Sequence, residues 1–495
     1  MLLHEAFEAT ASRVPAKTAL VCGDERVSYG ELQRRVHALA AQLQAAGVAP
    51  GDRVVLLLEG DVSYAIAVHA VLCAGAVFVP LTATTKPDKL AFVLNDTEAT
   101  TLLADARLRG TWADLPVRCP ALRRVIATDG FAADGERPPA PRIDQDLAAI
   151  IYTSGSTGTP KGVMLTHLNM LSAWRSVQAY LGLRTDDVIG LALPPTFSYG
   201  LYHLLMGLGL GATVVLERQA AFPLRLAQGL QRERATVIPG VPTLLASLLD
   251  LPQRATIDLS ALRLVTNAAA ALPTPLVPRL LEALPRADLL LMYGMTECKR
   301  ISYLPAEEAA RRPGSVGRGM PNQQHWLADE LSRPLPHGST GELVVRGAHV
   351  MRGYWRRPQE TAQRLRPSPI HGENVLHTGD LFRTDAEGWL HFVSRLDDII
   401  KTRGEKVAPR EVEEAIHRLP GVAACAVIGV PDDALGQAVK AYVVRRPGSE
   451  LTVREVTRHC LGHLENYMAP KQVEFVDTLP TTESGKIRHA TLRGG

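Results

Sequence analysis

The chain has 495 residues, several times the length of a typical domain, so we expect one large domain or several packed ones. Hydrophobic residues make up 46% of it and charged residues 21%, which is usual for a folded globular protein and excludes a disordered or fibrous one. The 54 basic and 51 acidic residues leave a formal net charge of +3 without a basic block, so we expect no nucleic-acid partner.

Two apolar stretches, residues 64–81 and 201–216, approach the length of a membrane span. Both are interrupted by His and Gly, and the first also by Pro, which favours a buried helix followed by a strand over a span. Residues 1–7 lack a basic segment followed by an apolar one, so we recognise no secretory signal. The six cysteines have no metal-site or redox-pair spacing, which suits reduced thiols and a cytoplasmic protein.

The first half of the chain alternates helical and strand-like patterns. Residues 30–46 carry apolar side chains at helical spacing, and the strand-like residues 53–58 follow. The alternation recurs over residues 61–80 and 223–239, and another strand is predicted at residues 147–151. This rhythm predicts an α/β fold.

The second half is organised differently. Between residues 341 and 393 the segments shorten and turn glycines multiply, which predicts a β-rich subdomain. A compact α+β unit is expected after it, with helices at residues 409–419 and 453–463 and strands at residues 423–428 and 439–444. We therefore predict a large N-terminal domain of packed α/β subdomains plus the β-rich subdomain, residues 1–394, and a small C-terminal domain, residues 395–495.

A loop of Gly, Ser and Thr follows the strand predicted at residues 147–151 and ends at Lys161. Glycines let backbone N–H groups approach an anion, hydroxyls add donors, and a lysine adds positive charge for a polyphosphate. The loop departs from the P-loop pattern because Pro160 replaces the second glycine and Gly162 replaces the magnesium-binding Ser or Thr. It is a candidate phosphate loop that disfavours ordinary P-loop hydrolysis, and a polar surface turn is the alternative.

Five segments in order resemble the signatures of the superfamily of AMP-forming acyl- and aryl-CoA ligases, amino-acid adenylation domains and beetle luciferases. They are residues 152–162 (YTSGSTGTPKG), 293–297 (YGMTE), 378–380 (TGD), Arg395 with 400–404 (IKTRG), and 484–487 (SGKI). Their order and separations argue against coincidence, and the resemblance covers nearly the whole chain. It implies a large N-terminal domain and a small, mobile C-terminal domain, like the division predicted above.

The resemblance implies a set of nucleotide-binding residues. The ATP- and AMP-binding set is Thr153, Ser154, Gly155, Ser156, Thr157, Gly158, Lys161, Tyr293, Asp380 and Arg395. In the family's pattern Tyr293 lies against adenine, Asp380 accepts the ribose hydroxyls, and Arg395 supplies a second ribose contact. Solvated turn residues are the alternative for Asp380 and Arg395.

Three further residues are implied to be catalytic. Thr296 hydrogen-bonds the α-phosphate, and Glu297 is an oxygen ligand for the Mg²⁺ bound to ATP. Lys486 reaches from the small domain to the substrate carboxylate and the α-phosphate, where an ammonium offsets the charge that develops during transfer. Without the resemblance, Glu297 would be read as a helix-start acid and Lys486 as a solvated lysine.

The same resemblance implies a rotation of the small domain between two poses. Asp397 occupies the hinge position, and Ser394 replaces the glycine that commonly precedes the hinge arginine. Gly404 belongs to the face used in the thioester step, and Lys401 is assigned to that face by its similarity to thioester-forming ligases.

The resemblance further implies an acyl pocket around six residues: Phe197, Tyr199, Gly200, Ala268, Gly294 and Met295. Ser198 follows Phe197 where amino-acid adenylation domains place an Asp for the substrate ammonium group, so a free amino acid is disfavoured. The apolar walls suit an aryl or moderately long acyl acid. Lys299 and Arg300 offer pairing with a second carboxylate, against the favoured alternative of a solvated or structural charge pair.

The leading hypothesis is ATP-dependent activation of a carboxylic acid to acyl-AMP with release of pyrophosphate, then transfer to the thiol of coenzyme A. In the alternative, the acceptor is the phosphopantetheine arm of a carrier protein. We expect that carrier to be a separate protein, because the printed chain ends nine residues after Lys486. More remote hypotheses are a luciferase-like oxygenase and a non-catalytic relative that binds a nucleotide or acyl ligand. The adenylation lysine argues against the binder.

Overall fold

The computed structural model describes residues 1–136, 139–153, 160–217, 222–252, 256–368, 372–403, 405–432, 435–481 and 487–493. The chain forms two compact units. Unit 1 contains residues 1–324 and 346–365, and unit 2 contains residues 325–345 and 366–495. The predicted boundary after residue 394 separates a large domain from a small domain that is expected to rotate between two poses. This boundary stays a prediction.

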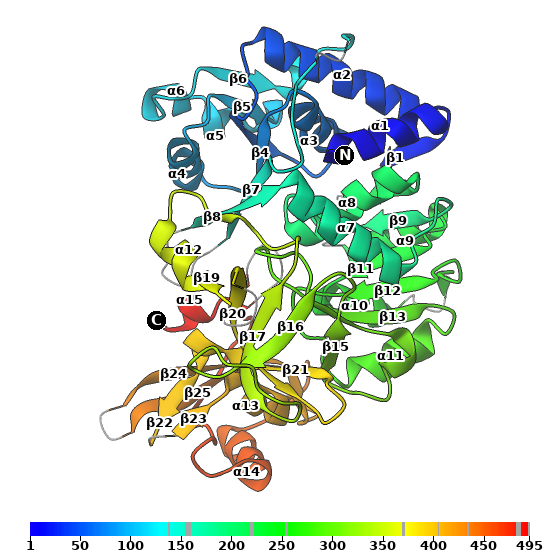
Figure 1. The fold of residues 1–495 in the computed structure, drawn as a ribbon. Coiled ribbons are helices and arrows are strands. Elements are labelled where there is room, and N and C mark those ends of the chain that lie inside the picture. Colours follow the sequence, from blue (N-terminus) through cyan, green and yellow to red (C-terminus); the bar gives the residue numbers. More distant parts are fainter. Residues whose placement is uncertain are drawn as a thin grey trace. The chain divides into compact units, whose positions relative to one another are not determined.

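The larger sheet of unit 1 has a parallel centre (Figure 1). Its strands run in the order β13 (Asp288–Tyr293), β12 (Leu264–Asn267), β11 (Val237–Gly240), β9 (Val188–Leu191), β10 (Thr213–Leu216) and β1 (Thr18–Cys22). Antiparallel strands flank this centre: β14 (Ser302–Leu304) beside β13, and β2 (Glu25–Ser28) beside β1. Parallel strands end at one edge of a sheet, so the loops after β9, β12 and β13 share that edge, which we call the carboxyl edge.

The second sheet of unit 1 positions the candidate phosphate lysine. Its strand order is β18 (Gly353–Tyr354), β8 (Lys161–Thr166), β7 (Leu147–Thr153), β4 (Val77–Thr82), β3 (Arg53–Leu58), β5 (Thr101–Ala104) and β6 (Arg124–Ala127). The hairpin of β7 and β8 pairs Thr153 with Lys161, so both ends of the candidate phosphate loop are held by strands. A Cβ atom on Gly162 would lie 2.7 Å from the Ile150 side chain, which explains the glycine at this position.

The two apolar stretches of the sequence form helix–strand pairs, as predicted. The first gives α3 (Val62–Cys73) and β4, and the second gives α8 (Ser198–Leu210) and β10. Both helices are buried on almost every face, because α3 packs against β3, β4 and the helix α2 (Tyr29–Ala45), and α8 packs against β9, β10 and the helix α1 (Leu3–Arg13). Among the described residues, none of the helices has the length and apolar character needed to cross a membrane.

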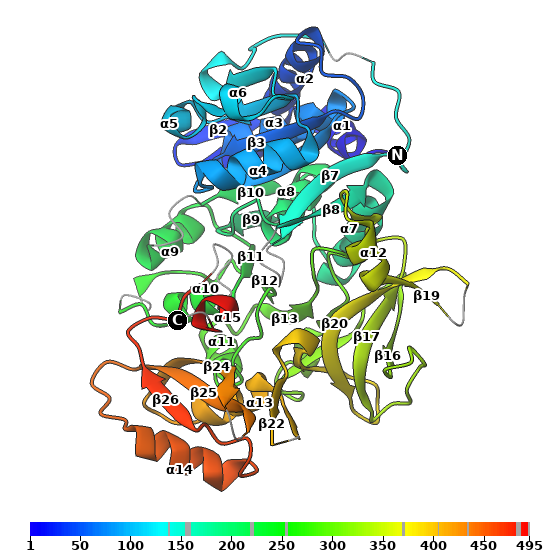
Figure 2. The same cartoon turned by 90° about the vertical axis from the view of Figure 1, so that its left-hand side faces the viewer.

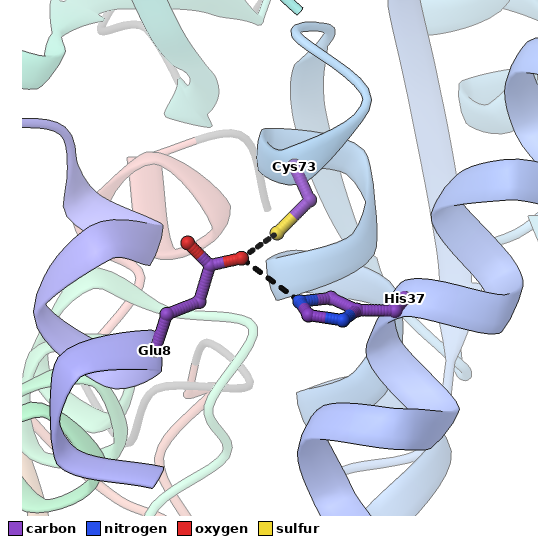
Figure 3. A group of neighbouring side chains, drawn as sticks. All are labelled: Glu8, His37 and Cys73. Atoms are coloured by element: carbon purple, nitrogen blue, oxygen red, sulfur yellow. Dashed lines mark hydrogen bonds and ion pairs between the residues drawn. The ribbon is translucent and has the colours of Figure 1, made fainter. Parts of the chain in front are cut away.

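Three helices of unit 1 meet at a small polar cluster (Figure 3). Glu8 lies on α1 (Leu3–Arg13), His37 on α2 (Tyr29–Ala45) and Cys73 on α3. The Glu8 Oε1 atom lies 2.9 Å from His37 Nε2 and accepts a hydrogen bond from the Cys73 thiol at 3.6 Å. Cys, His and Glu are potential metal ligands, and these ligand atoms lie within 4.8 Å of one another. A single oxygen of the Glu8 carboxylate contacts both His37 and Cys73, so we interpret the cluster as hydrogen bonds that link the three helices.

Unit 2 contains the predicted β-rich subdomain and the predicted α+β unit. The first is an antiparallel sheet of β16 (Gln324–Ala328), β17 (Thr340–Arg346), β20 (Asn374–Thr384) and β21 (Leu390–Arg395). The second is a sheet in the order β23 (Glu405–Val407), β22 (Ile400–Thr402), β25 (Gly436–Arg445) and β24 (Val422–Asp432), with β26 (Gln472–Phe475) parallel to β25. The helices α13 (Pro409–His417) and α14 (Val453–His463) cover it (Figure 2). The mixed α/β fold class is therefore confirmed.

Candidate active site

The segment that follows β13 folds back tightly on itself. A Cβ atom on Gly294 would lie 2.3 Å from the Lys299 carbonyl oxygen and 2.7 Å from the Arg300 Cα atom, so only glycine fits. Tyr293 ends β13 and stays half-buried, as do Gly294, Met295 and Thr296, whereas Glu297 is only 8% exposed. This turn places a buried carboxylate at the carboxyl edge of the larger sheet.

Tyr354 connects the predicted magnesium ligand to the predicted phosphate lysine. The Tyr354 hydroxyl donates to Glu297 Oε1 at 2.8 Å, and the Met351 backbone N–H donates to the Glu297 carbonyl oxygen at 2.7 Å. The Lys161 Nζ atom lies 5.8 Å from the centre of the Tyr354 ring. Burial, followed by the nearby negative charge of Glu297, raises the pKa of the Tyr354 phenol, so Tyr354 remains a hydrogen-bond donor at neutral pH.

Residues of the expected acyl pocket gather at the same carboxyl edge. Tyr199 is buried on α8, and its hydroxyl lies 2.7 Å from Thr266 Oγ1 on β12. Burial raises the pKa of Tyr199 to about 12, so its phenol is neutral. Phe197 precedes α8 and is half-buried, and Ala268 is buried directly after β12.

Gly200 permits the close contact that sets the start of α8. A Cβ atom on it would lie 2.5 Å from the Pro194 carbonyl oxygen. The loop before α8 therefore packs directly on the first turn of the helix, which orients Phe197 and Tyr199 at the carboxyl edge.

Lys299 and Arg300 are buried, with exposed fractions of 5% and 3%. The solvated alternative for this pair is therefore wrong, and a structural or a substrate-binding role remains. The Lys299 Nζ atom donates to the Ser198 carbonyl oxygen at 2.9 Å, which links the turn after β13 to the start of α8.

In unit 2 a separate group of polar residues surrounds Asp380. The Arg395 Nε atom on β21 lies 3.3 Å from Asp380 Oδ1 on β20, and β20 and β21 pair these two residues directly. The Gly379 N–H donates to Glu342 Oε1 at 2.8 Å, and His377 Nδ1 lies 2.8 Å from Glu342 Oε2. Burial raises the pKa of Glu342, but its hydrogen bonds with His377 and with the Gly379 N–H, together with the positive charge of Arg366, outweigh burial and leave that pKa below its usual value.

Sequence reasoning missed Tyr354 and Glu342. Tyr354 holds Glu297 from 57 residues away, and Glu342 holds the Gly379 backbone from 37 residues away. Neither residue belongs to a recognised signature. The available signal was an acidic residue, Glu342, between the apolar positions of a predicted β-rich segment.

The remaining predicted residues divide into two sets. Asp397 lies in a short 3₁₀ turn, Leu396–Asp398, and is exposed, as is Lys401 on β22. Outside the described residues lie Ser154, Gly155, Ser156, Thr157, Gly158, Gly404 and Lys486. Their predicted roles stay predictions.

Replacing Tyr354 by Phe tests the structural role of its hydroxyl. We expect Tyr354→Phe to lower the free energy of unfolding by about 1–3 kcal/mol, because the buried Glu297 carboxylate loses a hydrogen bond. Urea unfolding measures this change. Tyr303→Phe is the matched control, since Tyr303 is half-buried and packs by stacking its ring on Tyr180 at 4.1 Å. Equal losses for both variants would contradict the assignment.

The larger sheet carries a buried carboxylate at its carboxyl edge, and the signature segments follow one another in the family's order. Together these features define the class of adenylate-forming enzymes. The model of the AMP-binding enzyme family matches residues 7–355, and the model of the AMP-binding enzyme C-terminal domain matches residues 411–486. The chain therefore belongs to the AMP-binding enzyme family.

Known relatives and solved structures agree with this membership. Feruloyl-CoA synthase of an Amycolatopsis species is 38% identical over 480 residues, which cover 97% of this chain and 96% of that protein. A ring-substituted propanoyl:CoA ligase of Mycobacterium tuberculosis is 34% identical over 513 residues, covering 99% and 97%. The crystal structure of ATP-bound MatB from Rhodopseudomonas palustris has a TM-score of 0.91 at 31% identity and covers 100% of this chain and 99% of that one. The chain is an AMP-forming acid–thiol ligase that activates an acid with ATP and forms a CoA thioester.

Proposed function

We propose that the enzyme activates an aryl acid. The observation that carries this proposal is the buried ring of Tyr199, which Thr266 holds at the same carboxyl edge as Glu297. Half-buried Phe197 and buried Ala268 add apolar surface at that edge, and a flat aromatic acyl group packs well against such side chains. The similarity to a feruloyl-CoA synthase supports an aromatic acyl group.

In the proposed first reaction, a carboxylate oxygen of the acid attacks the α-phosphorus of ATP, and the bond to the β-phosphate breaks to release pyrophosphate. Thr296 and Lys161 hold the phosphates, and Lys486 offsets the charge that develops between the carboxylate and the α-phosphate. Residues 154–158 contribute backbone and hydroxyl donors by their similarity to the family's phosphate loop. Tyr293 binds adenine, and Asp380 and Arg395 bind the ribose.

Glu297 fits the predicted role of magnesium ligand. Its side chain is buried and carries an acceptor oxygen, the ligand type that Mg²⁺ prefers. Tyr354 donates to Oε1 only, and this hydrogen bond fixes the orientation of the carboxylate. Magnesium, when bound, supplies positive charge that draws electron density from the phosphates.

In the proposed second reaction, a thiolate sulfur attacks the acyl carbon, the new C–S bond forms, and AMP leaves. The small domain, residues 395–495, rotates about Asp397 between the two reactions, and the face that contains Lys401 and Gly404 then serves the thiol. Coenzyme A supplies this thiol, in agreement with the ligase relatives, which match this chain over almost their whole length. A separate carrier protein is the alternative acceptor.

The test is a panel of aryl, alkyl and amino acids incubated with ATP and Mg²⁺, with pyrophosphate release as the readout. Coenzyme A and a phosphopantetheinylated carrier protein are offered in parallel, and the thioester is identified by mass spectrometry. We expect aryl acids and coenzyme A to give the highest kcat/KM. Preference for an amino acid or for the carrier protein would overturn the corresponding part of the proposal.

A further inference from the structure

We propose that Lys299 and Arg300 form a binding subsite for a second carboxylate on the acid substrate. The inference rests on the proposed function, because that function places the acyl group beside Tyr199. It narrows the substrate class from aryl acids to aryl diacids, whose first carboxylate is adenylated and whose second carboxylate binds these two cations.

Lys299 and Arg300 lie mainly against aromatic rings. The Lys299 Nζ atom lies 4.5 Å from the centre of the Tyr202 ring and 5.3 Å from that of the Tyr199 ring, and it donates to the Ser198 carbonyl oxygen. The Arg300 guanidinium carbon lies 5.2 Å from the centre of the Tyr199 ring, and its positive charge acts on the nearby Tyr180 phenol. Among the described residues, the buried Arg300 Nε atom has no hydrogen-bond partner.

Among the described residues, neither Lys299 nor Arg300 forms an ion pair with an acid, and the contacts named above are to aromatic rings, a phenol and a backbone carbonyl. His203 adds no further positive charge, because burial, followed by the positive charge of Lys299, lowers its pKa to about 3 and keeps it neutral. Arg300 stays charged at neutral pH, as arginine does in proteins.

A buried cation without an anion is destabilising by several kcal/mol. Contacts with aromatic rings return only about 2 kcal/mol each when they are desolvated, so the rings offset part of this penalty. A purely structural role for Lys299 and Arg300 would therefore destabilise the fold, and two apolar residues would fill the same space at lower free energy. A bound carboxylate offsets the charge and supplies the acceptor that Arg300 Nε lacks.

Other features at the carboxyl edge also indicate a polar ligand. Buried side-chain atoms without a hydrogen-bond partner among the described residues are Thr196 Oγ1 after β9, His203 Nε2 on α8 and Asn267 Oδ1 at the end of β12. Lys299 has a φ of 62°, a left-handed conformation that is strained for a residue other than glycine. Strained backbone of this kind concentrates at functional sites, where the surrounding structure holds it in place.

Matched acid pairs test the subsite. Cinnamate is compared with 3-carboxycinnamate and 4-carboxycinnamate, which differ from it by one carboxylate, and pyrophosphate release gives kcat/KM for each acid. We expect the wild-type enzyme to prefer at least one diacid. We expect Arg300→Met to lower the ratio of diacid to cinnamate kcat/KM by about 30-fold, because a buried charge pair loses one partner. Lys299→Met should lower the same ratio.

Arg175→Met is the control, because it removes an equal charge from the exposed surface of α7 (His167–Leu181). A ratio that is the same in Arg300→Met, Arg175→Met and the wild type overturns the subsite, as does a wild-type preference for cinnamate over both diacids. If Arg300→Met does not fold, the subsite is tested by the ratio of diacid to cinnamate kcat/KM in the wild type and in Arg300→Lys. Lysine keeps the positive charge but lacks the planar set of donors, so this ratio should fall in Arg300→Lys. Activation of alkyl acids but of none of the aryl acids would instead overturn the proposed function.

Discussion

Lys486→Ala is expected to slow acid-dependent pyrophosphate release about 1000-fold. The attacking carboxylate and the α-phosphate are both anionic, and the proposed ammonium offsets the charge that builds up between them in the transition state. Loss of one preorganised electrostatic group of this kind reduces kcat by about 100- to 1000-fold. Pyrophosphate release under saturating ATP and acid measures the effect.

The control for this variant is Lys406→Ala, because Lys406 is 70% exposed and pairs only at 3.4 Å with an exposed Glu330. A second measurement separates the two reactions: preformed acyl-AMP and coenzyme A are given to Lys486→Ala, and thioester formation is followed. We expect this reaction to slow much less than adenylation. Adenylation at the wild-type rate would contradict the role of Lys486, and equal loss in both reactions would contradict its restriction to the first.

Glu297→Gln is expected to reduce kcat/KM for ATP by about 100-fold or more and to raise the Mg²⁺ concentration needed for half-maximal activity. Glutamine has nearly the same shape, and its amide oxygen still accepts the hydrogen bond from Tyr354, so the fold should be kept. The lost charge weakens the ligation of a hard divalent cation. Initial rates over a series of Mg²⁺ concentrations measure both effects.

The matched control is Glu308→Gln, which removes the same charge from an ion pair with Arg312 at 2.9 Å. It should leave the Mg²⁺ dependence unchanged. If Glu297→Gln lowers the rate without shifting the Mg²⁺ dependence, Glu297 acts on ATP in another way and the metal assignment is wrong.

Much of the fold was predictable because its signals are local. The interruption of an apolar stretch by His, Gly and Pro identified α3 with β4, and the bounds of α14 agree with the predicted residues 453–463. The predicted strands at residues 423–428 and 439–444 lie inside the longer β24 and β25. These two strands extend because they pair antiparallel from Val422 with Arg445 to Asp432 with Gly436, a register that residue patterns alone do not encode.

The site was predictable only where short signatures carry it. Thr296 and Glu297 lie in one such signature, and the turn after Tyr293 holds them together. Tyr354 and Glu342 act through contacts with residues 57 and 37 positions away, so only the folded chain reveals them. The burial of Lys299 and Arg300 was equally hidden, because it depends on the aromatic residues of α8, which lie about one hundred positions earlier.

The close contact of Gly294 with the backbone of Lys299 and Arg300 also constrains how this enzyme can acquire new substrates. Catalysis and selectivity share one backbone turn, so an insertion or deletion that reshapes the acyl site would also displace Glu297. Exchange of the two cationic side chains leaves that turn intact. Substrate range in this enzyme is therefore expected to diversify by point substitution at residues 299 and 300, and a library restricted to these two positions should retain adenylation while its preferred acid changes.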